Sequence, residues 1–110
     1  MQIDLSLLSY DPQWYAFRDG AELEIRPFPN SRGNVAWRNG EMVLSGEERL
    51  ERFMYCLSGW KGLTDADGKP LKCSEQVKKA IFDFNVAGIP EFVAEKDREF
   101  HERKEQEEKN

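Results

Sequence analysis

Two aspartates flank an alanine just before a glycine in segment 57–74, LSGWKGLTDADGKPLKCS, the most chemically suggestive stretch of the chain. An EF-hand calcium loop needs oxygen ligands at positions 1, 3 and 5, glycine at position 6 and glutamate at position 12. If Asp65 takes position 1, position 6 is Pro70. If Gly68 takes position 6, position 12 is Ser74. Both registers fail, so the spacing argues against an EF-hand calcium site.

The same two aspartates are weak candidates for general acid/base catalysis. A catalytic carboxyl group needs burial or a charged partner that shifts its pKa, and the tip of a turn offers neither. The flanking segments KGLT and KPLK predict a hairpin-like turn in which Gly68 takes a positive φ. We therefore interpret 57–74 as a connector between two helices, anchored to the core by Trp60.

One histidine and two cysteines are the other side chains with catalytic potential. Because His101 is the only histidine, a histidine triad or a histidine-pair metal site within one chain is excluded. Its charged surroundings predict an exposed side chain. The two cysteines form neither a CxxC motif nor a disulfide framework, and both thiols are expected to be reduced. Cys56 should be buried beside a helical stripe. Cys73 precedes a helix N-terminus, a setting that can lower a thiol pKa. We predict no catalytic, metal-binding or cofactor-binding residue, no cofactor and no enzymatic activity.

Composition limits the partners. The chain has 110 residues with a net charge of −5, enough for one domain with a modest core. Nucleic-acid binders cluster lysine and arginine, so the acidic balance argues against nucleic acid as a partner. No apolar run approaches the roughly 20 residues that span a bilayer, and the segment MQIDLSLLSYDP lacks the features of a signal peptide. We expect a cytoplasmic protein with no membrane partner.

The first half of the chain has the pattern of antiparallel strands. Segment 2–8, QIDLSLL, predicts a short strand. The Asp19-Gly20 turn should pair 13–17 with 21–28, AELEIRPF, in which apolar and polar residues alternate. Beyond the expected loop NSRGN, VAW and MVLS flank the turn signal Asn39-Gly40, which predicts a second hairpin.

The second half has the pattern of three helices. Ser45 and Glu48 have capping-box spacing, and an apolar stripe follows that fades at Ser58-Gly59: Leu50, Phe53, Met54 and Leu57. Ser74 is the second expected N-cap, before a stripe that closes at Gly88: Val77, Ala80, Ile81 and Phe84. Pro90 suits the first turn of the third helix, whose stripe is Ile89, Phe92, Val93 and Phe100.

These elements predict an α+β fold, a small N-terminal antiparallel sheet followed by three helices, the last extended and charged. Residues 1–100 should form a single domain, and 101–110 a charged helical tail that frays. Five aromatic residues fall on or beside inward-facing positions and are expected in the core: Trp14, Phe17, Phe53, Trp60 and Phe84. For Phe28 and Trp37 we favour a place in the core, and a role as an anchor in a protein interface is the alternative. With Phe100 they are the candidate partner contacts.

The order of motifs resembles a known family. Trp14 and Phe17 precede Asp19-Gly20-Ala21 and Ile25-Arg26-Pro27, then GWKGLTDADGKPLKCSEQ follows, and the chain ends in Glu108-Lys109-Asn110. This order, over residues 14 to 110, resembles small tail assembly chaperones of tailed bacteriophages and prophages. The resemblance implies a non-enzymatic protein of the bacterial host cytoplasm that engages the tape-measure protein or another tail protein.

Two alternatives stay open. One is a structural virion component, such as a minor tail or head–tail completion protein. The other is an enzyme, for which a cleft containing Asp65, Asp67 or Cys73 would be required. The chain could form a homo-oligomer as an assembly chaperone or as a virion component. In some phages such a chaperone also has a longer form, made by a translational frameshift.

Overall fold

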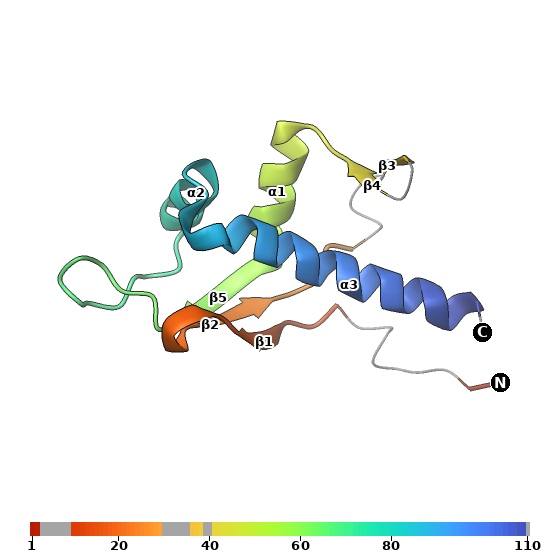
Figure 1. The fold of residues 1–110 in the computed structure, drawn as a ribbon, viewed down its shortest axis with the longest axis horizontal. Coiled ribbons are helices and arrows are strands. Elements are labelled where there is room, and N and C mark those ends of the chain that lie inside the picture. Colours follow the sequence, from red (N-terminus) through yellow and green to blue (C-terminus); the bar gives the residue numbers. More distant parts are fainter. Residues whose placement is uncertain (3–9, 30–35, 39–40, 110) are drawn as a thin grey trace.

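The computed structural model describes residues 1–2, 10–29, 36–38 and 41–109, with the backbone alone for 36–38, 41–43 and 104–109. The α+β prediction is confirmed: helices cover one face of a three-stranded antiparallel sheet (Figure 1). The strand predicted at 2–8 lies almost wholly outside the described residues. The loop NSRGN and the Asn39-Gly40 turn also lie outside them.

The sheet has the order β1-β2-β5, built from β1 (Gln13–Ala16), β2 (Glu22–Ile25) and β5 (Leu57–Lys61). The predicted pairing across Asp19-Gly20 is confirmed, and both turn residues have positive φ, 54° and 79°, as a tight hairpin requires. Alternation places Leu23 in the core while its neighbours Glu22 and Glu24 point away from it.

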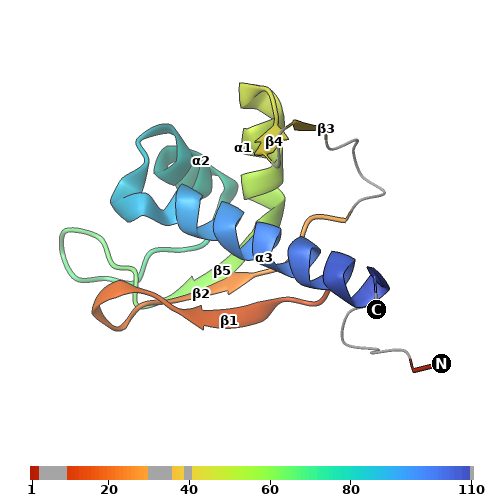
Figure 2. The same ribbon diagram turned by 45° about the vertical axis from the view of Figure 1, so that its right-hand side comes forward.

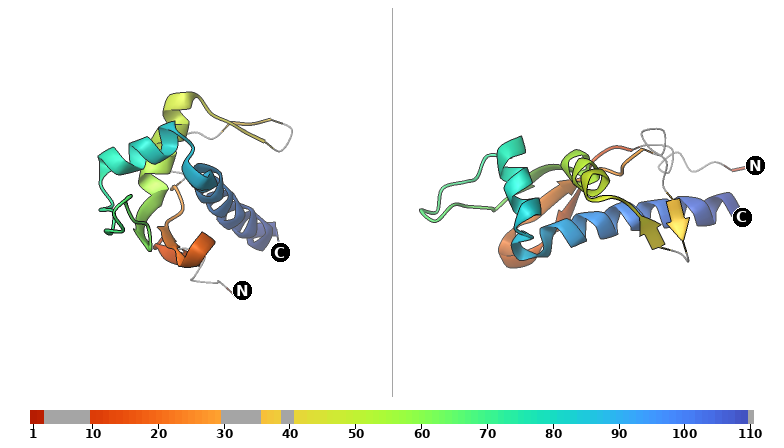
Figure 3. Two further views of the ribbon diagram at one scale, coloured as in Figure 1. Left: turned by 60° about the vertical axis from the view of Figure 1, so that its left-hand side comes forward. Right: turned by 90° about the horizontal axis from the view of Figure 1, so that it is seen from above.

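The second predicted hairpin is also confirmed. Strands β3 (Ala36–Arg38) and β4 (Glu41–Val43) pair antiparallel, with Trp37 opposite Met42. They form a separate two-stranded sheet that lies apart from the first one (Figure 3).

Three helices follow: α1 (Gly46–Cys56), α2 (Glu75–Asp83) and α3 (Ile89–Lys109). Both predicted N-caps are confirmed, because Ser45 Oγ accepts from the Glu48 amide and Ser74 Oγ accepts from the Val77 amide. The long α3 crosses the other helices and extends past the sheet (Figure 2).

The prediction that a loop follows α1 was wrong. The chain enters strand β5 directly at Leu57. β5 pairs with β2, which supplies the sheet with its third strand. The Lys78 ammonium group donates to the Met54 and Leu57 carbonyls at 2.7 and 2.9 Å. Carbonyls at the helix end are therefore satisfied without another helical turn.

The core confirms some of the expected aromatic positions and corrects others. Phe53 is buried, and Phe17 and Trp60 pack against the core while partly exposed. Trp14 is 43% exposed, since it points away from the buried face of β1 and stacks under Lys61 at 4.4 Å. Phe84 is 81% exposed because α2 ends at Asp83, and the ring of Phe82 packs against Phe53 instead.

Candidate binding groove

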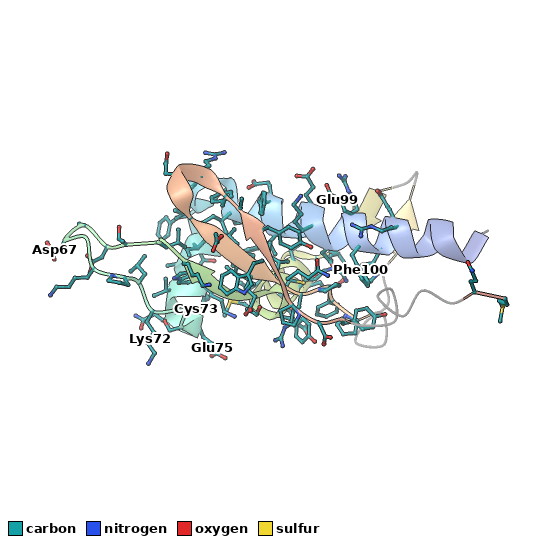
Figure 4. The ribbon with its side chains drawn as sticks, turned by 90° about the horizontal axis from the view of Figure 1, so that it is seen from below. Asp67, Lys72, Cys73, Glu75, Glu99 and Phe100 are labelled. Carbon is teal, nitrogen blue, oxygen red and sulfur yellow. The ribbon has the colours of Figure 1, made fainter. Side chains whose placement is uncertain are left out.

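The Asp65–Gly68 tetrapeptide is a turn, as predicted. Asp65 Oδ1 accepts from the backbone amides of Asp67 and Lys69 at 2.8 and 3.0 Å, and Gly68 has φ 79°. Asp67 lies at the outer end of the projecting loop (Figure 4). Trp60 Nε1 donates to the Leu71 carbonyl at 2.8 Å, which fastens the loop to β5. The Trp60 side chain packs against the core, as expected. Over the described residues, no three histidine, cysteine, aspartate or glutamate side chains gather where they could hold a metal ion.

The two cysteines are separate free thiols. Cys56 is buried as predicted, and burial raises its pKa far above the usual range. Burial raises the pKa of the Cys73 thiol, and the nearby charge of Lys78 does not offset this effect. A raised pKa leaves less thiolate at neutral pH, so neither cysteine has the character of a nucleophile.

A buried ion pair links α1 to α3. The Arg52 guanidinium contacts Asp97 Oδ2 through Nε and Nη2, both at 2.7 Å, and the two side chains are 10% and 2% exposed. The other carboxylate oxygen, Oδ1, accepts from the Phe28 amide at 2.9 Å. The guanidinium also lies 4.7 Å from the centre of the Phe28 ring. One carboxylate thus holds two helices and the segment after β2 together.

His101 belongs to the same cluster, and the prediction of an exposed side chain was wrong. Its side chain is only 10% exposed. Nε2 lies 2.9 Å from the Phe28 carbonyl and 3.3 Å from Asp97 Oδ1. One turn of helix separates Asp97 from His101, so the buried face of α3 continues past residue 100. The division into 1–100 and 101–110 remains a prediction, although α3 crosses it without a break.

The environment of Asp97 favours its charged form. Burial opposes ionisation, but the hydrogen bonds from His101 and the Phe28 amide, together with the charge of Arg52, outweigh it. The pKa of Asp97 is therefore lowered. Sequence reasoning missed both Arg52 and Asp97. The position of Asp97 could have indicated its burial, because it follows Val93 by four residues and so lies on the predicted apolar face of α3.

Beside this ion pair lies a groove of about 700 Å³. Its walls come from α1 and α3, and the end of α2 closes one side. The apolar part of the lining consists of Leu44, Phe53, Cys56, Phe82, Pro90, Val93 and Ala94. Neither Asp65, Asp67 nor Cys73 contributes to it.

The charged side chains of the groove lie mainly along its two rims. Arg49 is exposed on α1, and Glu91 and Glu95 are exposed on α3. None of the three forms an ion pair with another side chain in the described part of the chain. Arg98, further along α3, pairs with Glu102 at 3.7 Å. The groove therefore combines an apolar lining with charges that are available to a partner.

The corner between α2 and α3 places apolar side chains next to the groove. Phe84 and Val86 are exposed there, on either side of the groove residue Asn85. Asn85 and Ala87 have φ of 47° and 53°. A left-handed conformation costs about 1–2 kcal/mol in a residue with a Cβ, so Ala87 is held in a strained geometry.

The three candidate partner contacts have different surroundings. Phe28 is 5% exposed and belongs to the core, packed edge-to-face on Tyr55 at 5.4 Å. Phe100 is half-buried between Tyr10 and His101, at ring distances of 5.6 and 5.4 Å. The side chain of Trp37 lies outside the described residues. Neither Phe28 nor Phe100 belongs to the groove lining that the structure describes.

Comparisons with protein-family models, with curated proteins and with solved structures found no match. The resemblance to tail assembly chaperones thus stays an expectation from the motifs. Of the helices in the described ranges, none is both long and apolar enough to cross a membrane.

Proposed function

We propose that this chain is a non-enzymatic phage or prophage protein that assists tail assembly by binding the tape-measure protein or another tail protein. The observation that carries the binding role is the groove between α1 and α3. It joins an apolar lining to unpaired rim charges, the surface composition that suits recognition of another protein. The assignment to tail assembly is supported by the order of motifs from residue 14 to residue 110.

The residues with catalytic potential have structural roles that favour binding over chemistry. Asp65 orders a turn through two backbone amides. Asp97 is neutralised by Arg52 and engaged by the Phe28 amide. Both thiol pKa values are raised by burial.

Co-expression with the tape-measure product of the same gene cluster tests the proposal. We expect the two proteins to elute together on size exclusion, and separate elution would overturn the tape-measure assignment. Mass spectrometry of purified particles separates the alternatives. An assembly factor should be absent from them, whereas stoichiometric amounts would identify a structural virion component.

A further inference from the structure

We propose that the groove between α1 and α3 binds one amphipathic helix of a partner protein. The apolar face of that helix lies on the groove lining, and lysine or arginine residues along one edge face Glu91 and Glu95. This inference rests on the binding role proposed above and adds the chemistry of the partner.

The size and the walls of the groove favour a helix. The volume of about 700 Å³ corresponds to roughly two turns of an α-helix about 10 Å across. An extended segment would need a strand edge to satisfy its backbone amides and carbonyls. The walls are helices, whose backbone groups are already bonded internally, so they offer no such edge. A helix satisfies its own backbone and presents only side chains.

The rim charges specify the edges of this helix. Glu91 and Glu95 are one turn apart on α3, so their carboxylates lie along the same side of that helix. Arg49 occupies the opposite rim on α1. A helix with basic residues towards α3 and an acidic residue towards α1 would pair with all three. The opposite orientation would place like charges together, so the charges also select a direction.

Among the residues that the structure describes, a second copy of this chain does not supply such a helix. The apolar residues of α1, α2 and α3 are used largely in the chain's own core. In α2 the basic residues are engaged, Lys78 with two carbonyls and Lys79 with Asp83. The sequence of residues 101–110, HERKEQEEKN, has no apolar residue. The occupant is therefore a helix from a different protein.

The probe is a synthetic amphipathic peptide of roughly 18 residues, or five helical turns, made of leucine, alanine and lysine. Its control replaces each lysine with glutamate. Fluorescence anisotropy should show that the protein binds the lysine peptide roughly threefold to tenfold more tightly than the glutamate peptide, the effect expected from two exposed charge pairs.

Glu91→Lys with Glu95→Lys should reverse this preference. The matched control is Glu47→Lys with Glu51→Lys. It makes the same charge change at the same spacing, also beginning in the first turn of a helix, but away from the groove lining. The control should keep the wild-type preference. Equal affinity of the wild type for both peptides, or an unchanged preference in the Glu91/Glu95 variant, would overturn the inference.

A second pair of variants tests occupancy without changing charge. Ala94→Trp fills the groove from an exposed position and should abolish peptide binding, whereas Ala80→Trp adds the same bulk on an exposed position of α2 outside it. Peptide binding by Ala94→Trp would contradict the inference. A protein dimer that dissociates when the peptide is added would also contradict it.

The two proposals can fail separately. If the peptides behave as expected but no complex with the tape-measure protein forms, the groove binds a helix and only the assignment of the tail partner is wrong. If a complex with the tape-measure protein forms and none of these substitutions affects it, the binding role holds and only the inference about the groove is wrong.

Discussion

Arg52 and Asp97, 45 positions apart in sequence, form a buried ion pair with 2.7 Å contacts that joins α1 to α3 beside the groove. The pair sets the relative position of the two groove walls. Removing one member of a buried pair leaves the other charge without compensation, which typically costs about 3–5 kcal/mol. The groove therefore depends on an interaction that does not itself face a partner.

Asp97→Asn should lower the free energy of unfolding by about 3 kcal/mol, because Arg52 is then left buried without its counter-charge. Urea unfolding monitored by circular dichroism measures this. Asp83→Asn is the control, since the Lys79–Asp83 pair is exposed and such pairs contribute about 0–1 kcal/mol. Arg52→Leu combined with Asp97→Asn should recover part of the loss. Equal effects of Asp97→Asn and Asp83→Asn would contradict this account of the ion pair.

Stability should depend on pH through Asp97. Its pKa is lowered in the folded protein, as burial is outweighed by the hydrogen bonds of His101 and Phe28 and by Arg52. The unfolded carboxyl group, with a pKa of about 3.9, then takes up its proton at a higher pH than the folded one. The stabilisation that the charged Asp97 gives to the folded protein is complete above the unfolded pKa. It is lost as the pH falls through the folded pKa.

Urea unfolding of the wild type and Asp97→Asn between neutral and strongly acidic pH measures this dependence. The stability difference between them should shrink as pH falls below about 4. A difference that stays constant down to the lowest pH would show that Asp97 does not carry the effect.

Thiol labelling should distinguish the two cysteines. Cys56 is buried with a strongly raised pKa and should react only when the protein unfolds. Cys73 is half-buried, and burial raises its pKa as well, so it should react in the folded protein but more slowly than a free thiol at the same pH. Labelling with a chromogenic disulfide, followed by peptide mapping, gives both rates. A Cys73 rate above that of the free thiol would show that its thiolate is stabilised after all.

Asp65→Ala should lower the free energy of unfolding by about 1 kcal/mol, because Asp65 Oδ1 accepts two backbone hydrogen bonds in the turn. Asp67→Ala should have almost no effect, since no side-chain hydrogen bond of Asp67 is described and it lies exposed at the loop end. Neither the wild type nor the double variant should show a calcium-dependent Tm. A calcium-dependent rise in the wild type that the double variant loses would mean that the loop binds the ion.

Local patterns were enough to predict most elements of the fold. The Asp19-Gly20 turn, the N-caps Ser45 and Ser74, and the apolar stripe through Ile89 and Val93 each depend on residues close in sequence. Burial of Phe84 was predicted wrongly for a related reason: the helical period extends to it, but α2 has already ended at Asp83.

The groove could not be predicted, because its parts meet only in the tertiary structure. Arg52 and Asp97 are typical surface residues in composition, and only their contact explains their burial. Segment 57–61 has no clear strand pattern because Ser58 and Gly59 weaken it. Its pairing with β2 joins residues that are 32 to 39 positions apart in sequence. His101 follows the same rule, since its partner Phe28 is 73 positions distant.

The central claim is that this chain acts by binding a partner protein in the groove. Its most direct test is quantitative co-purification of the tape-measure product with the wild type, with Ala94→Trp and with Ala80→Trp. We predict that the wild type and Ala80→Trp retain the partner equally and that Ala94→Trp loses it while keeping its Tm. Retention by a folded Ala94→Trp equal to that of the wild type would contradict the claim.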